Sequence, residues 1–109
     1  MDIDKIRQCV RESRYLYSQH AEHRRKTEGL TFEQIEEALL SGQIIEDYAD
    51  TGRGESCLIV GFSGSVAIHA VCGRRGDKVV IITVYVPRPP KFVDPWTRGS
   101  VSSDEPEKV

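Results

Sequence analysis

One short segment near the start of the chain contains residue types that suit proton transfer and anion binding. His20 and Arg24 are four residues apart, so on a helix they share one face, and His23 lies at an edge of that face. Imidazole titrates near neutral pH, and a guanidinium binds phosphate or carboxylate through two parallel hydrogen bonds. The pair is therefore suited to a phosphate-bearing substrate. The competing interpretation is structural: His20 hydrogen-bonds a strand end, and Arg24 belongs to a solvated basic turn with the two basic residues that follow it.

A second set of polar side chains falls on segments with the pattern of strands. Because side chains alternate along a strand, residues 79–86 are expected to turn an all-aliphatic face to the core, made of Val80, Ile82, Val84 and Val86. Thr83 and Tyr85 then lie on the opposite face near the strand's end. His69, on the preceding predicted strand, has small neighbours that leave room for a ligand. Whether it shares a face with Tyr85 depends on register, and the alternative is a histidine on a solvated sheet face.

Neither a metal site nor a cofactor is predicted. His69 and Cys72 are three residues apart, and on a strand that spacing points them to opposite faces. The chain has no Cys-x-x-Cys motif, and residues 73–76 lack the third glycine and the following helix of a dinucleotide fingerprint. Cys57 and Cys72 lie in apolar strands, where cysteine acts as a small core residue.

Three helices are expected to precede the strands. Residues 2–12 carry a narrow apolar stripe at helical spacing, and residues 15–17 form either a brief strand or the end of that helix. Ser18 is an N-cap candidate for a second helix that Gly29 ends. Thr31 and Gln34 have the spacing of a capping box, which predicts a third helix that ends at Gly42.

Beyond residue 42 the period becomes extended. Strands are expected over residues 43–48, 57–62, 66–72 and 79–86, with hairpin turns at 63–65 and 73–78. Helices followed by strands predict an α+β fold, in which N-terminal helices pack on one face of an antiparallel sheet of about four strands. Three prolines, at positions 87, 89 and 90, end the last strand because proline cannot donate to a ladder. The chain reads as one domain over residues 1–100 and a disordered tail over 101–109.

Composition is that of an ordinary folded domain: 39% of the residues are hydrophobic and 29% are charged. The sequence has no apolar run long enough for a membrane helix, and its start has no signal-peptide pattern, so no membrane association and a cytoplasmic location are expected. An odd number of cysteines, three, favours reduced thiols over a disulfide framework.

Charge is segregated along the chain, although the net charge is only −2. Basic residues outnumber acidic ones seven to five in residues 1–30 and six to two in residues 56–101, whereas residues 31–55 hold one basic and seven acidic residues. If the fold places the two basic segments side by side, they form a patch for an anionic partner. The alternative is that these charges solvate separate faces.

The pattern as a whole resembles a bacterial family known as domain of unknown function forty-two fifty-eight. The resemblance covers about residues 15 to 98 and rests on Ser18-Gln19-His20-Ala21 with Arg24, Gly29-Leu30-Thr31, residues 42–48, Ser56-Cys57-Leu58, His69, and Ile82-Thr83-Val84-Tyr85 followed by Pro87. Lys91 and Trp96 depart from the family pattern, which has adjacent Lys and Trp and then an arginine. Here four residues separate them, and Arg98 follows.

The resemblance implies a small toxin of a toxin–antitoxin pair, with a RelE-like or barnase-like α+β fold and RNA cleavage without metal. It implies RNA as substrate and a zinc-finger antitoxin as protein partner. The residues at matching positions, implied as catalytic, are His20, Arg24, His69, Thr83 and Tyr85, and those implied to bind substrate are Lys91, Trp96 and Arg98.

Metal-free RNA cleavage needs a base for the ribose 2′-hydroxyl, cations for the transition state and an acid for the leaving oxygen. Either His20 or His69 could be the base, and Tyr85 or the other histidine the acid. Arg24 and Arg98 could hold phosphate, and Trp96 could stack on an unpaired base. Two other interpretations stay open: a non-catalytic module that binds protein or nucleic acid, and a purely structural or immunity-type partner.

Overall fold

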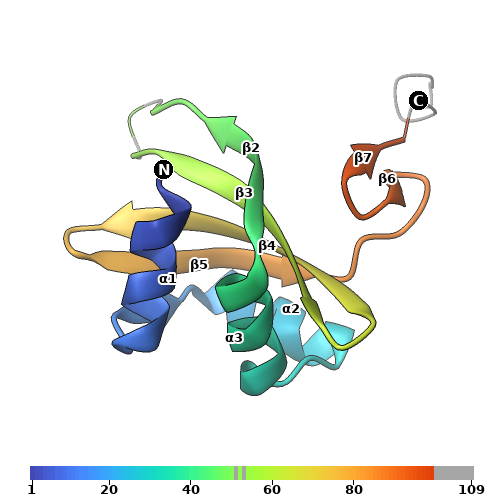
Figure 1. The fold of residues 1–109 in the computed structure, drawn as a ribbon, viewed down its shortest axis with the longest axis horizontal. Coiled ribbons are helices and arrows are strands. Elements are labelled where there is room, and N and C mark those ends of the chain that lie inside the picture. Colours follow the sequence, from blue (N-terminus) through green and yellow to red (C-terminus); the bar gives the residue numbers. More distant parts are fainter. Residues whose placement is uncertain (51, 53, 100–109) are drawn as a thin grey trace.

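The structure, a computed structural model, describes residues 1–50, 52 and 54–99, so the predicted tail over 101–109 lies outside the described residues. Within them the chain forms three helices and seven strands (Figure 1). The helices are α1 (Ile3–Arg11), α2 (Gln19–Glu28) and α3 (Phe32–Ser41). The strands are β1 (Tyr15–Tyr17), β2 (Gln43–Tyr48), β3 (Ser56–Ser63), β4 (Val66–Arg75), β5 (Lys78–Tyr85), β6 (Phe92–Asp94) and β7 (Thr97–Arg98).

The helix ends lie where capping chemistry predicts them. The Ser18 side chain accepts a hydrogen bond from the Ala21 amide, and Gly29 ends α2 in the left-handed conformation. Thr31 and Gln34 form the predicted capping box at the start of α3. Residues 15–17 form a strand, which settles the alternative that the sequence left open.

The main sheet of the described chain has five strands in the order β1-β5-β4-β3-β2. Strands β2 to β5 form an antiparallel meander, as expected, while β1 runs parallel to β5 and adds a fifth strand to the four predicted. The extra strand pairs with a segment more than sixty residues later in the chain, a contact that no local pattern encodes. The turn between β4 and β5 is also tighter than predicted, because β4 continues to Arg75 and β5 begins at Lys78.

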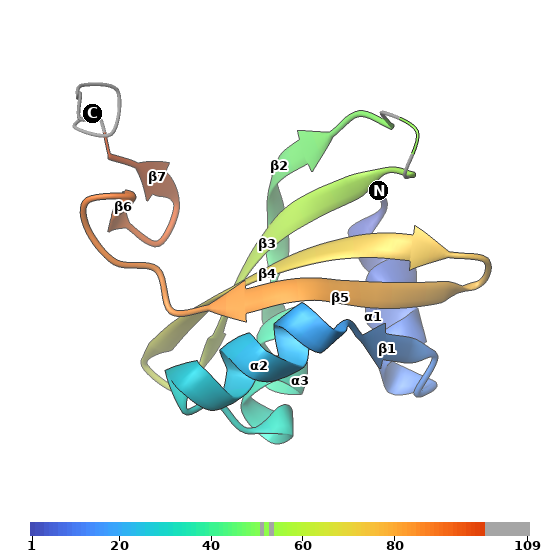
Figure 2. The same ribbon diagram turned by 180° about the vertical axis from the view of Figure 1, so that it is seen from behind.

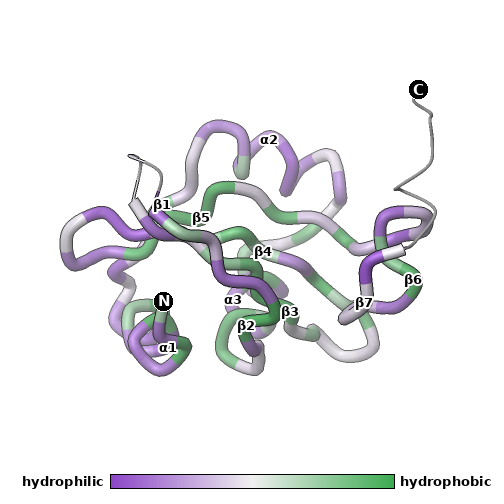
Figure 3. The backbone as a smooth tube through the Cα atoms, turned by 90° about the horizontal axis from the view of Figure 1, so that it is seen from above, coloured by the Kyte–Doolittle hydropathy of each residue, from purple (hydrophilic) through white to green (hydrophobic). Residues whose placement is uncertain are grey.

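Helices α1 and α3 cover one face of the sheet (Figure 1). Helix α2 lies along β5, on the opposite side of that strand from α1 and α3 (Figures 2 and 3). The prediction that the N-terminal helices pack on one face therefore holds for two of the three. The reason is composition: Ala21 is the one residue of α2 that is buried, so this polar helix has no apolar stripe to lay on a sheet. It instead packs along the β5 side, and Ala21 joins a core that α1, α3 and the sheet build.

The predicted core face of β5 is wrong in its first half. Val79 and Ile81 are in the core, and Ile82 is exposed. Val71 pairs with Thr83 but the next residue of β4 pairs with Ile81, so Ile82 is an extra residue, a β-bulge. The bulge switches the alternation, and from Val84 onward the predicted faces are correct.

After Pro87 the chain does not simply leave the sheet. Strands β6 and β7 pair as a small antiparallel hairpin that the sequence did not predict, and its side chains return to the outer face of the sheet, the face away from α1 and α3. Phe92 of this hairpin is buried and packs edge-on against His69, with ring centroids 4.4 Å apart. The hairpin therefore covers one end of the outer face.

Candidate functional site

A cationic pocket of about 510 Å³ lies where α2, the end of β5 and the C-terminal hairpin meet. Six of the eight predicted site residues line it: His20, Arg24, Thr83, Tyr85, Lys91 and Arg98. The remaining lining residues are Val86, Arg88, Pro89, Pro90 and Phe92. We call this hollow the basic pocket; it draws its residues from both basic segments of the chain.

Helix α2 is fixed to β5 at its first turn, and this fixes the direction of its pocket face. The hydroxyl of Ser18 caps the helix and also donates to the carbonyl oxygen of Ile82 at 2.8 Å. His20 and Arg24 then lie on the same side of the helix, facing the pocket, as their spacing predicts, whereas His23 does not line it. Arg25, next to Arg24, is structural: it pairs with Glu22 and stacks on Phe32 at 4.1 Å.

Arg24 has hydrogen-bond donors to spare. Its guanidinium is 3.5 Å from Glu28 and lies over the Tyr85 ring, 5.7 Å from the centroid. Its buried Nε atom has no hydrogen-bond partner among the described residues. Thr83 likewise lines the pocket with a buried hydroxyl oxygen that has no partner in the described chain. Both atoms therefore lack the hydrogen bond that buried polar atoms usually make.

His69 lies behind the pocket and does not line it. It is directly opposite Tyr85 in the β4–β5 pairing and is 0% exposed. Its Nδ1 atom is 3.3 Å from the Tyr85 hydroxyl, and its Nε2 atom is 2.6 Å from the carbonyl oxygen of Pro95. The alternative that places His69 on a solvated sheet face is therefore wrong. Burial lowers the pKa of His69, so the ring is neutral near pH 7.

The C-terminal hairpin supplies the far wall and is held by an ion pair. Arg98 donates to both carboxylate oxygens of Glu46 in β2, at 2.7 and 2.9 Å, and stacks over Phe92 at 4.9 Å. Lys91 also lines the pocket, and no ion pair involves its side chain within the described residues. Trp96 is elsewhere: it packs on Phe62 with 49% of its surface exposed and does not line the pocket.

Sequence reasoning missed three residues that build this site. Glu28, at the end of α2, accepts hydrogen bonds from the Val86 amide at 2.8 Å and from Arg88 at 3.0 Å, and so ties the helix to the segment after β5. Arg88 adds a further cation to the pocket. Glu46 holds Arg98. Glu28 and Glu46 lie far along the chain from their partners. In the sequence each is only a charged residue, and no pattern assigns its side chain to a particular face of the fold.

The Glu46–Arg98 pair makes stability depend on acid pH. Its hydrogen bonds lower the pKa of Glu46 to about 2, below its usual 4.5, so the stabilisation is complete above about pH 4.5 and is lost as pH falls toward 2. Because Arg98 is more than half exposed, we expect Arg98→Ala to lower the free energy of unfolding by only about 1 kcal/mol near pH 7. Urea unfolding followed by circular dichroism should show this difference shrinking between pH 5 and pH 2. A difference that stays constant with pH would contradict the assignment.

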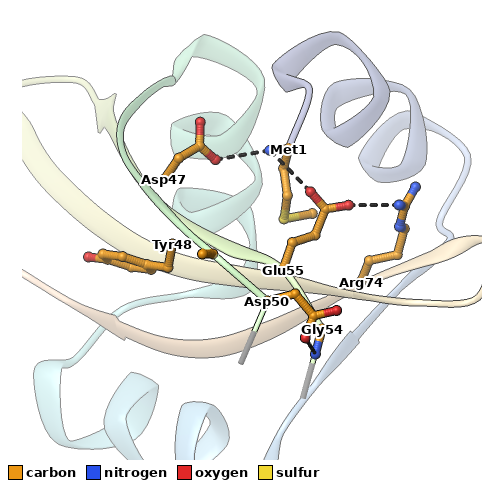
Figure 4. A pocket seen from close by; sticks show the side chains of 8 residues that line it. Met1, Asp47, Tyr48, Asp50, Gly54, Glu55 and Arg74 are labelled. Atoms are coloured by element: carbon orange, nitrogen blue, oxygen red, sulfur yellow. Dashed lines mark hydrogen bonds and ion pairs between the residues drawn. The ribbon is translucent and has the colours of Figure 1, made fainter. Parts of the chain in front are cut away.

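A larger hollow, about 690 Å³, lies between the N-terminus and the sheet (Figure 4). Most of its charged groups pair with each other: the Met1 ammonium is 2.9 Å from Asp47 and 3.4 Å from Glu55, which also pairs with Arg74. Asp50, which also lines the hollow, accepts hydrogen bonds from the backbone amides of Gly52 and Gly54. Across residues 1–50, 52 and 54–99, no three His, Cys, Asp or Glu side chains are placed to hold a metal ion.

Comparison with family models places most of this architecture in one family. The model described as Domain of unknown function (DUF4258) matches residues 17–86. The chain belongs to the DUF4258 family. Searches among curated proteins and among solved structures return no match. In the described part of the chain, no helix has the length and apolarity to cross a membrane.

The DUF4258 segment runs from β1 through β5, so it contains α2, β4 and β5 with His20, Arg24, His69, Thr83 and Tyr85. It ends before the hairpin that carries Lys91, Trp96 and Arg98. The basic pocket is thus built jointly: the DUF4258 segment provides its floor, and residues outside the match provide one wall. Of the residues beyond the match that the sequence analysis implied to bind substrate, Lys91 and Arg98 belong to that wall and Trp96 does not.

Proposed function

We propose that this protein is a metal-independent RNA endonuclease with a RelE-like fold that acts as the toxin of a bacterial toxin–antitoxin pair. The observation that carries the proposal is the basic pocket. It gathers four Arg and Lys side chains, a histidine, a tyrosine and a threonine, and in the described chain no carboxylate residue lines it. A pocket of this charge and size suits a phosphodiester with its adjoining sugar.

The pocket residues fit the needs of phosphodiester cleavage. Arg24 and Arg98 would hold the phosphate and stabilise the charge that develops in the transition state. His20 is exposed and lines the pocket, where its imidazolium form would protonate the leaving oxygen. Trp96 lies outside the pocket with an exposed ring, where it could stack on an unpaired base of the same strand.

Toxin action implies control by a partner. From the family resemblance we propose a small zinc-finger antitoxin as that partner and the cytoplasm as the site of action. An antitoxin that covers the basic pocket would exclude RNA from it. Its contact surface would then carry negative charge to complement the four cations.

One observation favours a second candidate, a module that binds an anionic partner without catalysis. Arg24, Arg88 and Arg98 each already contact a carboxylate, Glu28 or Glu46. This pairing reduces the positive potential available to a transition state. A binding module would lose affinity gradually as pocket cations are removed, whereas an enzyme would lose its rate at single positions.

A matched pair of histidine variants tests the enzymatic proposal. We expect His20→Ala to lower the rate of cleavage of single-stranded RNA by about 10²–10⁴-fold, the usual contribution of a general acid or base. His23→Ala is the control, because His23 is exposed on the same helix and lies outside the pocket. Cleavage should be measured in the presence of a metal chelator, beside growth of a bacterial host after induction. Unimpaired growth and intact RNA with the folded parent protein would contradict the proposal.

A further inference from the structure

The hydrogen bonds of His69 determine which of its nitrogens carries a proton. The Pro95 carbonyl oxygen, 2.6 Å from Nε2, can only accept, so Nε2 is the protonated nitrogen. The buried ring is neutral near pH 7, and in a neutral imidazole the other nitrogen is an acceptor. Nδ1 therefore faces the Tyr85 hydroxyl as an acceptor, and Tyr85 donates to it at 3.3 Å.

This bond also determines what Tyr85 presents to the pocket. Its single hydroxyl proton is directed at His69, away from the pocket, so the lone pairs of the phenol oxygen are free to face a ligand. Arg24 lies over the same ring and Thr83 is two residues away on the same face of β5. The phenol oxygen is thus a hydrogen-bond acceptor placed among groups suited to hold a phosphate. A hydroxyl group of a bound substrate is the partner that it would accept from.

We propose that His69 is a positioning residue that takes up the Tyr85 proton while the Tyr85 oxygen removes a proton from the attacking ribose 2′-hydroxyl of RNA; this rests on the proposed function. The 2′ O–H bond breaks and its proton passes to Tyr85, whose own proton passes to Nδ1 of His69; we call this double transfer the relay. The freed electron pair of the 2′ oxygen forms the new bond to phosphorus. The bond from phosphorus to the 5′ oxygen breaks, and that oxygen takes a proton from the His20 imidazolium.

Burial disfavours the imidazolium form of His69, and three groups around the ring modify that effect. The imidazolium that forms would keep its hydrogen bond to the Pro95 oxygen, which favours the charged ring. Charged groups act on the ring from two other elements: Glu46 of β2 favours the imidazolium and Arg98 of β7 disfavours it, while Tyr85 faces it from β5. Because the pKa of Tyr85 is raised, chiefly by burial, the tyrosine does not ionise alone, and a base behind it is required for proton removal.

The same contacts connect the C-terminal hairpin to this proton path. Pro95 and Phe92 of the hairpin region hold His69, and Arg98 and Glu46 hold the hairpin. The hairpin lies outside the DUF4258 match, so residues beyond the family segment set the tautomer of a histidine inside it.

The test uses the full chain and a short labelled single-stranded RNA, beside the same strand with 2′-deoxyribose at the cleaved position. We expect His69→Asn to lower cleavage by about 10²-fold or more and to remove the limb of the pH–rate profile that rises with pH as His69 loses its proton. His69→Gln, which retains a donor for Pro95, and Tyr85→Phe should lose rate to the same extent. The double variant His69→Asn/Tyr85→Phe should be no slower than either single variant, because both act in one step.

A second measurement does not depend on activity. Nitrogen-15 NMR of the His69 ring should show Nε2 protonated and Nδ1 unprotonated near pH 7. A ring protonated on Nδ1, or folded His69 variants with an unaltered rising limb, would overturn the relay and leave the proposed function intact. Failure of the parent protein to cleave any RNA would overturn the proposed function together with the relay. Cleavage of the deoxy strand at the same rate would exclude the 2′-hydroxyl as the attacking group and overturn the relay alone.

Discussion

Gly61→Ala is expected to lower the free energy of unfolding by about 3 kcal/mol or more, the upper range for overpacking a core. Gly61 is in β3, directly under α3. A Cβ atom at this position would lie 1.8 Å from the carbonyl oxygen of Ala38 and 2.7 Å from its Cα atom. These are backbone atoms of a helix, so no side-chain rotation can relieve the clash. Helix α3 would have to move off the sheet and open the core around Ile35 and Leu39.

Gly73→Ala is the matched control for Gly61→Ala, since Gly73 is also a strand glycine. A Cβ atom there would meet the Cδ1 atom of Ile82 at 3.1 Å. That atom is the end of a flexible, exposed side chain, so we expect a change within about 1 kcal/mol. Urea unfolding followed by circular dichroism measures both variants. Equal stability of the two variants would show that α3 does not pack on β3 as closely as the structure indicates.

Arg24→Ala is expected to lower RNA cleavage by about 10²–10³-fold, as removal of one hydrogen-bond donor to a developing charge does in other enzymes. The expected loss is large because Arg24 lines the pocket and its guanidinium lies over the Tyr85 ring. Its ion pair with Glu28 is of the i,i+4 type and contributes about 0.5 kcal/mol, so the variant should remain folded.

Two further variants separate the effects of charge and geometry. Arg24→Lys keeps the charge but loses the planar fork, and we expect it to recover only part of the lost rate. Lys26→Ala, on the same helix and outside the pocket lining, should cleave as the parent does. The measurement is the single-turnover rate on a labelled RNA. If Lys26→Ala and Arg24→Ala lost the same modest amount of activity, general electrostatic attraction would replace phosphate positioning as the explanation.

The sequence by itself determined the features that depend on neighbours along the chain. Ser18 and Gly29 bound α2, and the Thr31–Gln34 box starts α3, because capping bonds span only three or four residues. The shared face of His20 and Arg24 follows from helical spacing alone. The strands of the meander follow from apolar runs and intervening glycines. Each of these signals is local, so a single sequence contains it.

Only the tertiary structure decided how those parts meet. The pairing of His69 with Tyr85 depends on register, and the bulge at Ile82 depends on how β5 packs against both the core and α2. The return of the C-terminal hairpin to His69, the partners of Glu28 and Glu46, and the parallel addition of β1 all join segments distant in the chain. The physical reason is that these contacts are selected by the burial of the whole core and by charge pairing across it, and both are properties of the folded chain rather than of any segment.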